Sequence, residues 1–199
     1  MAMQMTVEVE SSEEGLNRAR HLLQNGRFVD ASATCRDILN QEPDHRDALY
    51  TLAVAERLSK DAPAALGTLE HLIGSNPSYG RAWQERGHCL RDLGRTEEAF
   101  AAYQSAITHN GALAASWRML AQLHRAAGRD AQAGFAESQF TYLSSLPPEL
   151  QTVASYIQEG RIVKAEQVCR AFLQREGHNV EAMRLLAEIG TTGLEALVL

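Results

Sequence analysis

The sequence predicts an all-α fold, a helical solenoid in which about five helical pairs and a terminal helix form a right-handed superhelix. A composition of 45% hydrophobic and 22% charged residues suits a folded chain with a substantial core. The decisive observation is a fixed period of about 34 residues, which separates Pro43 from Pro77, each between two helical patterns. The same step recurs in three further sets, namely Gly94 and Gly128, Trp83 and Trp117, and the series Ala31, Ala65, Ala99 and Ala133.

Residues 1–11 form a head that we expect to be disordered, because this segment lacks the apolar periodicity needed to join a core. The first unit, residues 12–45, has a weak first helix but a clear turn at Gly26. Glycine in such a turn accepts a positive φ without a steric penalty. The second helix of this unit carries Ala31 and Ile38 at helical spacing, so the unit is predicted as a helical pair.

The next two units, residues 46–79 and 80–113, are the most regular. Both place large and small apolar residues at helical spacing. In residues 46–79 these are Leu49, Leu52, Ala53, Ala65, Leu69 and Leu72. In residues 80–113 they are Trp83, Gly87, Leu90, Ala99, Tyr103 and Ala106. Small residues let two helices cross closely, and large residues fill the space beside the crossing. Each pair leaves a face that only a neighbouring pair can bury, so the units are expected to stack.

The fourth unit, residues 114–145, keeps the pattern, but the fifth, residues 146–179, is out of step. Gly160 follows Gly26 by two positions fewer than four full periods. We expect the two missing residues in the fourth unit or in the segment 144–148. The proline pair of that segment must end one helix and can start the next, and a changed packing angle is expected there.

A sixth first helix, about residues 180–189, is expected to remain without a complete partner helix. It is predicted to stop at the Gly-Thr-Thr-Gly segment 190–193, and residues 190–199 then form an apolar tail. A repeat array normally closes with a polar outer face. The apolar tail therefore suggests that the chain is cut short or that this end is covered by another molecule.

The repeated residues resemble the consensus of the tetratricopeptide repeat (TPR), and the resemblance covers about residues 12–189. It implies a helical array whose first helices line a concave surface, which binds a protein or peptide partner. A narrower resemblance is to the N-terminal TPR region of bacterial TPR–sulfotransferase proteins. It rests on Gly94-Arg95-Thr96-Glu97-Glu98-Ala99, Trp117-Arg118-x-Leu120, Pro147-Pro148-Glu149-Leu150, Glu159-Gly160-Arg161 with Ala165-Glu166, and Ala182-Met183-Arg184-x-Leu186-Ala187-Glu188-Ile189.

In the TPR–sulfotransferase family, the array precedes a catalytic domain that takes sulfate from the nucleotide donor PAPS. Its phosphate-binding loop is a Ser-Gly-Thr-Thr type turn between a strand and a helix. The nearest string here, residues 189–193, follows a helix and has no upstream strand pattern. This chain is therefore expected not to be an enzyme by itself, although a longer protein carrying it could be a sulfotransferase.

Charge and composition exclude several classes of function. The net charge of −6 disfavours binding to nucleic acid or to an anionic membrane. The N-terminus has no signal-peptide pattern and no segment has the apolar length of a membrane span, which predicts a cytoplasmic protein. The three cysteines and seven histidines show no metal-ligand spacing, so we expect buried free thiols, no metal site and no cofactor.

The TPR resemblance implies that consensus positions 2, 5, 9 and 12 of each first helix point into the groove. In the second to fourth units these positions hold five arginines and one aspartate, Asp47. Arginine suits carboxylate or phosphate recognition, although arginine is also common on exposed helix faces. The predicted groove residues are Arg57, Arg81, Gln84, His88, Arg91, Arg118, Gln122 and Arg125.

The leading functional hypothesis is an interaction scaffold that binds an acidic partner segment in this groove. One alternative is an accessory array of a sulfotransferase whose catalytic domain is absent from this chain. Another is a structural homo-oligomer held by the exposed terminal repeats. For residues 180–199 we predict either that they pair two copies as a two-fold homodimer or that they fold back as a cap over the fifth unit.

The repeat register predicts that Ala99 sits at a close helix crossing. Ala99→Leu should then overpack the third unit and lower the free energy of unfolding by about 1–3 kcal/mol. Urea denaturation of the two proteins measures this difference. An unchanged unfolding midpoint would show that the register is wrong.

Overall fold

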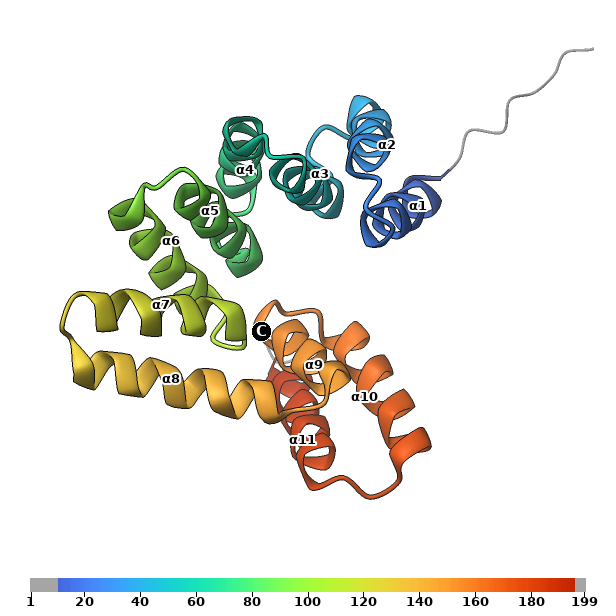
Figure 1. Cartoon of the computed structure of the whole chain (residues 1–199). Coiled ribbons are helices and arrows are strands. Elements are labelled where there is room, and N and C mark those ends of the chain that lie inside the picture. Colours follow the sequence, from blue (N-terminus) through green and yellow to red (C-terminus); the bar gives the residue numbers. More distant parts are fainter. Residues whose placement is uncertain (1–10, 196–199) are drawn as a thin grey trace, which may run out of the picture. The chain divides into compact units, whose positions relative to one another are not determined.

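The computed structural model describes residues 11–195, with side chains described as far as Thr191, and this range is all-α. Figure 1 shows its 11 helices following one another as pairs joined by short turns. The helices are α1 (Ser12–Gln24), α2 (Phe28–Gln41), α3 (Arg46–Leu58), α4 (Ala62–Ser75), α5 (Gly80–Asp92), α6 (Thr96–His109), α7 (Ala114–Ala126), α8 (Asp130–Ser145), α9 (Pro148–Gln158), α10 (Ile162–Glu176) and α11 (Val180–Glu195). The predicted all-α class and the pairwise arrangement of helices are confirmed.

The described residues divide into two compact units. The N-terminal unit comprises residues 11–77 together with Asp92–Gly94, and the C-terminal unit comprises Ser78–Arg91 and residues 95–195. In the N-terminal unit, α1 packs on α2, α2 on α3 and α3 on α4.

The first helix starts at a capping box. The Ser11 hydroxyl accepts a hydrogen bond from the backbone N–H of Glu14, and the Glu14 carboxylate accepts one from the backbone N–H of Ser11. Two donors that the helix itself cannot satisfy are thereby satisfied, which fixes the start of α1.

The alanine series lies where the repeat register requires it. Ala31, Ala65, Ala99 and Ala133 are each at most 1% exposed, on α2, α4, α6 and α8. Another small residue, Gly87 of α5, lies in close contact with α6. A Cβ at this position would lie 2.6 Å from the ring of Tyr103. No larger side chain fits there without displacing the tyrosine ring.

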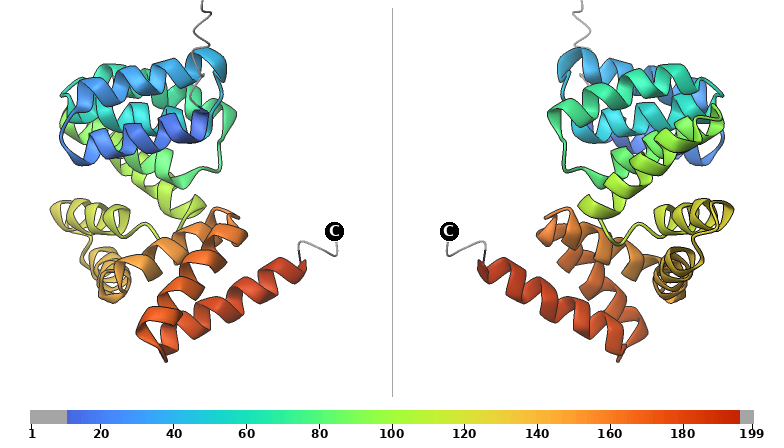
Figure 2. Two further views of the ribbon diagram at one scale, coloured as in Figure 1. Left: turned by 90° about the vertical axis from the view of Figure 1, so that its right-hand side faces the viewer. Right: turned by 90° about the vertical axis from the view of Figure 1, so that its left-hand side faces the viewer.

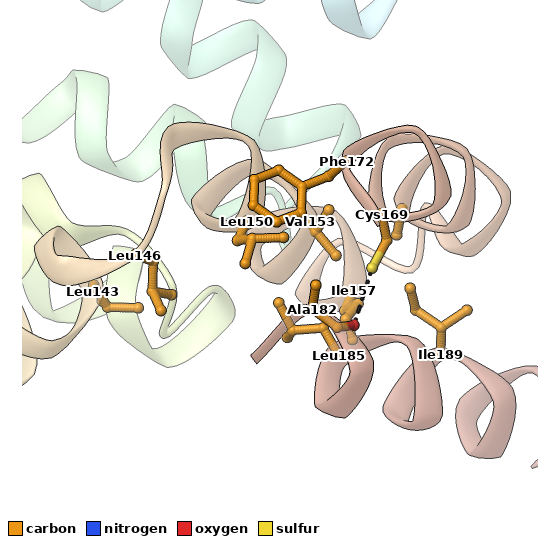
Figure 3. Packing of buried hydrophobic residues seen from close by; sticks show 11 residues of the cluster. Leu143, Leu146, Leu150, Val153, Ile157, Cys169, Phe172, Ala182, Leu185 and Ile189 are labelled. Atoms are coloured by element: carbon orange, nitrogen blue, oxygen red, sulfur yellow. Dashed lines mark hydrogen bonds between the residues drawn. The ribbon is translucent and has the colours of Figure 1, made fainter. Parts of the chain in front are cut away.

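The C-terminal unit ends in three helices that pack on one another, α9, α10 and α11 (Figure 2). Figure 3 shows their shared core, in which Leu150 and Val153 of α9 lie opposite Phe172 of α10 and Leu185 of α11. Cys169 donates a hydrogen bond to the backbone oxygen of Ala182 at 3.2 Å. Helix α11 is therefore anchored on two preceding helices, although the repeat pattern gives it no partner helix of its own.

All three cysteines are buried free thiols, as the sequence suggested. Burial raises the pKa of the Cys35 thiol to about 12 and also raises the pKa of Cys169. These two thiols stay protonated near neutral pH, which disfavours nucleophilic reactions at them.

The two-residue deficit of the fifth unit lies in α9, not in the fourth unit or in segment 144–148 as expected. α9 has 11 residues, whereas α3, α5 and α7 have 13 each. α8 is two residues longer than α6, and only two residues join it to α9, so α9 still begins one full period after the start of α7. Pro148 takes the first helical position of α9, where its fixed φ suits a helix start.

The last helix continues beyond its predicted end. α11 runs through Gly190 and on to Glu195, so the expectation of a stop at residues 190–193 is wrong. Glycine weakens a helix but does not end one unless the backbone adopts a positive φ, and Gly190 is not among the positive-φ glycines. The predicted disordered head, apart from Ser11, and the last four residues of the predicted apolar tail lie outside the described residues.

The turn within each helical pair has a left-handed residue. Gly26, Gly94, Gly128 and Gly160 have φ values of 68–73°, and the second pair has Lys60 at φ 68° in the same place. A residue with a Cβ is strained in this conformation, so Lys60 carries a cost that the glycines avoid.

Lys60→Gly should therefore stabilise the chain. Relief of the left-handed strain exceeds the entropy that glycine adds to the unfolded chain, so the free energy of unfolding should rise by up to about 1 kcal/mol. Urea denaturation measures the change, and the reverse substitution Gly94→Lys should destabilise by a similar amount. A loss of stability in Lys60→Gly would contradict the assignment of strain to this turn.

Candidate binding surface

The predicted groove residues lie on the first helices α3, α5 and α7. Arg57 of α3 belongs to the N-terminal unit, and the other seven belong to the C-terminal unit. Arg57 is largely buried and its guanidinium lies 3.8 Å from the carboxylate of Asp92. The carboxylate of Asp92 thus compensates part of the positive charge of Arg57.

Arg81 of α5 already holds a carboxylate. Its Nε donates to Oε1 of Glu159 at 2.7 Å, and its Nη2 donates to the Ser155 hydroxyl at 3.1 Å. Glu159 follows the last residue of α9, so these contacts join positions 78 residues apart. They show that the second position of this first helix has the geometry to bind a carboxylate.

Glu159 is held by more than one group. Its Oε1 also accepts from the Ser155 hydroxyl at 3.2 Å and from the amide of Asn110 at 3.3 Å. Its other oxygen, Oε2, lies 3.7 Å from Nη1 of Arg161 and accepts no hydrogen bond from the described residues. The Glu159 side chain is only 2% exposed, so a charged group is buried with one of its two oxygens incompletely satisfied.

Both arginines that face Glu159 also contact one aromatic ring, that of Tyr156. The guanidinium carbon of Arg81 lies 5.8 Å from the centre of the Tyr156 ring, and that of Arg161 lies 4.7 Å from it. Cation–π attraction adds to the ion pairs and fixes where the two positive charges lie.

A cavity of about 230 Å³ opens beside this cluster, within the C-terminal unit. Arg81 and Gln84 of the predicted groove line it from α5, and Ser155 lines it from α9. The remaining wall is formed by the start of α7 and by Pro148, Gln151 and Thr152. The structure therefore brings two of the predicted residues together around a cavity of mixed polarity.

The other predicted residues of α5, which are Gln84, His88 and Arg91, contact other side chains of the C-terminal unit. The Gln84 side-chain oxygen accepts a hydrogen bond from the Ser116 hydroxyl at 3.0 Å. His88 shares a hydrogen bond of 2.8 Å between its Nδ1 and the Tyr103 hydroxyl, which connects it to α6. Arg91 is exposed, and its Nη1 lies 3.4 Å from the sulfur of Met119.

The three predicted residues of α7, which are Arg118, Gln122 and Arg125, are exposed. Arg118 lies over the ring of Phe140, with 5.8 Å between guanidinium carbon and ring centre, and Arg125 forms an ion pair with Glu137. The positive charge counted from the sequence is thus reduced by acidic residues at positions outside the consensus, namely Asp92, Glu137 and Glu159.

Sequence reasoning missed Asn110, Ser155 and Glu159. One signal was present, because Ser155 and Glu159 replace Leu123 and Ala127 at the same distance from the turn glycine as in the preceding pair. The signal is weak, because the first pair also has polar residues at these two positions, His21 and Asn25. Arg81, the partner of Ser155 and Glu159, could not be identified from spacing, since nothing local connects it to α9.

A second cavity, of about 370 Å³, lies between α6, α7 and α8. It is bordered by Trp117 and by Phe135, whose rings meet edge to face at 5.7 Å. His124 also lines it, and its Nδ1 has no hydrogen-bond partner in the described part of the chain. Desolvation and the nearby charge of Arg129 lower the pKa of His124, which keeps the ring neutral at pH 7.

No group of three or more His, Cys, Asp or Glu side chains in residues 11–195 is arranged to hold a metal ion. Over the same range, none of the helices combines the length and the apolar character that crossing a bilayer requires.

Two family models described as tetratricopeptide repeat match the chain, one over residues 22–86 and the other over 61–114. No curated protein matches it. Neither family model includes a sulfotransferase, so that association rests on the sequence motifs alone, and residues 189–193 lie within α11 and form no loop between a strand and a helix.

Several solved structures share the fold at low identity. The Pseudomonas aeruginosa protein pilF is 21% identical with a TM-score of 0.61, and the match covers 93% of this chain and 85% of that one. The Thermus thermophilus protein TTC0263, described as a thermophilic TPR protein, is 18% identical with a TM-score of 0.60 and coverage of 90% and 98%. MamA from Desulfovibrio magneticus RS-1, residues 41 to the end, is 19% identical with a TM-score of 0.57 and coverage of 67% and 76%.

Proposed function

Because this chain is a tetratricopeptide repeat protein, we propose that it is a scaffold that binds an acidic segment of a partner protein on the faces of α5 and α7. The observation that carries this proposal is the contact between Arg81 and Glu159. A guanidinium placed at the second position of a first helix binds a carboxylate in this chain, and a partner can offer the same group.

The shape of the surface supports the proposal. The 230 Å³ cavity lies beside Arg81 and has room for one side chain of a bound segment. Gln84 and Thr152 supply polar groups at its wall, while Pro148 and the alanines at the start of α7 supply apolar surface. Sites that recognise a peptide commonly combine apolar surface with a few fixed polar groups.

Further along the same first helices, Arg91 and Arg118 are exposed. Exposed arginines attract an acidic segment over several ångströms, and salt weakens this attraction. We therefore assign Arg81 and the cavity to short-range recognition, and we assign Arg91 and Arg118 to attraction of neighbouring acidic residues in the segment.

Reversal of the two exposed charges tests this function. A fluorescein-labelled deca-glutamate peptide should bind the wild-type chain, and Arg91→Glu with Arg118→Glu should raise its Kd at least about tenfold at low salt. Fluorescence anisotropy at low and high salt measures both effects. The matched control, Lys164→Glu with Arg170→Glu on α10, makes the same change in net charge and should alter the Kd less than about twofold.

Two results would count against this function. Absence of deca-glutamate binding to the folded wild-type chain removes the acidic-segment proposal. Equal weakening by the α10 control variant would show that the net charge of the chain matters and that the α5 and α7 faces do not.

A second candidate, self-association through α11, is favoured by one observation. Val180 is 80% exposed and Met183 is 46% exposed on this helix, whose opposite face is buried against α9 and α10. We propose that this apolar face meets the same face of a second copy, because identical surfaces related by a two-fold axis are self-complementary.

Val180→Glu with Met183→Glu should convert a dimer into a monomer, since two desolvated carboxylates oppose the pairing. Sedimentation equilibrium measures the mass. The control Val163→Glu changes a similarly exposed valine on α10 and should leave the mass unaltered. A wild-type chain that sediments as a monomer at high concentration would refute the pairing.

A further inference from the structure

We infer that Glu159 is an internal ligand of the candidate surface, and that an acidic partner binds by replacing Glu159 on Arg81. This inference rests on the proposed function, since it concerns the same arginine and the same class of partner. It adds a contact that opposes binding and thereby sets how acidic a partner must be.

The first argument is the identity of the contact. Glu159 presents a carboxylate to Nε of Arg81 at 2.7 Å, which is the charge-assisted geometry expected for a bound acidic side chain. Its side chain is 2% exposed while that of Arg81 is 28% exposed. Arg81 is thus accessible from outside, and its intramolecular ligand occupies the inner side.

The second argument is access. Arg81 and Ser155, both in contact with Glu159, line the 230 Å³ cavity, whereas the buried Glu159 is not part of its lining. A partner carboxylate that enters the cavity meets the Arg81 guanidinium and the Ser155 hydroxyl first. Both are donors that Glu159 uses, so the two carboxylates compete for the same hydrogen bonds.

The third argument is that Glu159 has an alternative partner. Arg161 Nη1 lies 3.7 Å from Oε2, the oxygen that accepts no hydrogen bond from the described residues. A small rotation of the Glu159 side chain would shorten this contact while the contact to Arg81 lengthens. The buried carboxylate therefore need not lose all ion pairing when a partner takes Arg81, which makes the exchange feasible.

Glu159→Gln tests the competition, because glutamine keeps the shape and can still accept from Asn110 and Ser155 but has no charge. The variant should bind deca-glutamate about 5- to 10-fold more tightly than the wild type. Without the Glu159 charge, a larger fraction of the protein has Arg81 available to the peptide. Anisotropy measures the Kd, and thermal unfolding confirms that the variant is folded. Adding Arg81→Gln to Glu159→Gln should abolish the gain.

The matched control is Glu166→Gln on α10, which removes one charge from an exposed pair with Arg170. Its Kd should stay within about twofold of the wild-type value. Tightening by Glu166→Gln equal to that by Glu159→Gln would overturn the inference, because net charge alone would then explain the gain.

Hydrogen exchange tests the same inference on the wild-type chain, without any substitution. Saturating deca-glutamate should speed hydrogen exchange of the amides at residues 157–161, which the displaced Glu159 no longer fixes. If deca-glutamate binds but neither the exchange at these amides nor the Kd of Glu159→Gln changes, the internal ligand is refuted and the scaffold function stands. If neither protein binds deca-glutamate, the acidic-segment function itself is refuted, and the inference with it.

Discussion

Close approach between helices is the constraint on which the rest of this structure depends. The second helices of the first four pairs bury an alanine, Ala31, Ala65, Ala99 or Ala133, and α5 approaches its neighbours at two glycines. At Gly87 even a single Cβ would come within 2.6 Å of the Tyr103 ring, and at Gly80 within 2.7 Å of Asn110. Because packed interiors leave few voids, such contacts fix the distance and angle between α5 and α6.

That geometry decides where the polar contacts of the candidate surface fall. Gly80 brings the start of α5 against Asn110, whose amide in turn donates to Ser155 of α9 at 2.9 Å. Arg81, the next residue after Gly80, is thereby placed beside Glu159. Removing one member of a fully buried ion pair costs about 3–5 kcal/mol, and the 28% exposure of Arg81 puts this pair below that range. The proposed exchange requires that this contact cost less to break than a fully buried ion pair.

Much of the fold followed from the sequence because local rules set it. The fixed repeat period, the buried alanines and the left-handed glycines each depend on contacts within one helical pair. The sequence-based prediction placed the two-residue deficit at the wrong point of the chain. A helix such as α9 can be shorter than its counterparts without any residue type that marks where it was shortened. The pairing of Arg81 with Glu159 could not be predicted, since 78 residues separate the partners and only the packing of α9 brings them together.

The pairing of arginines with the chain's own carboxylates also bears on which partners this surface can select. When a partner with one carboxylate replaces Glu159 on Arg81, the number of ion pairs at Arg81 is unchanged, so little free energy is gained. A segment with several carboxylates differs, because its other charges meet Arg91 and Arg118 while the first occupies Arg81. The internal carboxylate would therefore discriminate against isolated acidic residues and in favour of acidic stretches. This discrimination requires no additional groove residue, and it is consistent with a chain whose net charge is −6 and whose arginines face acidic side chains.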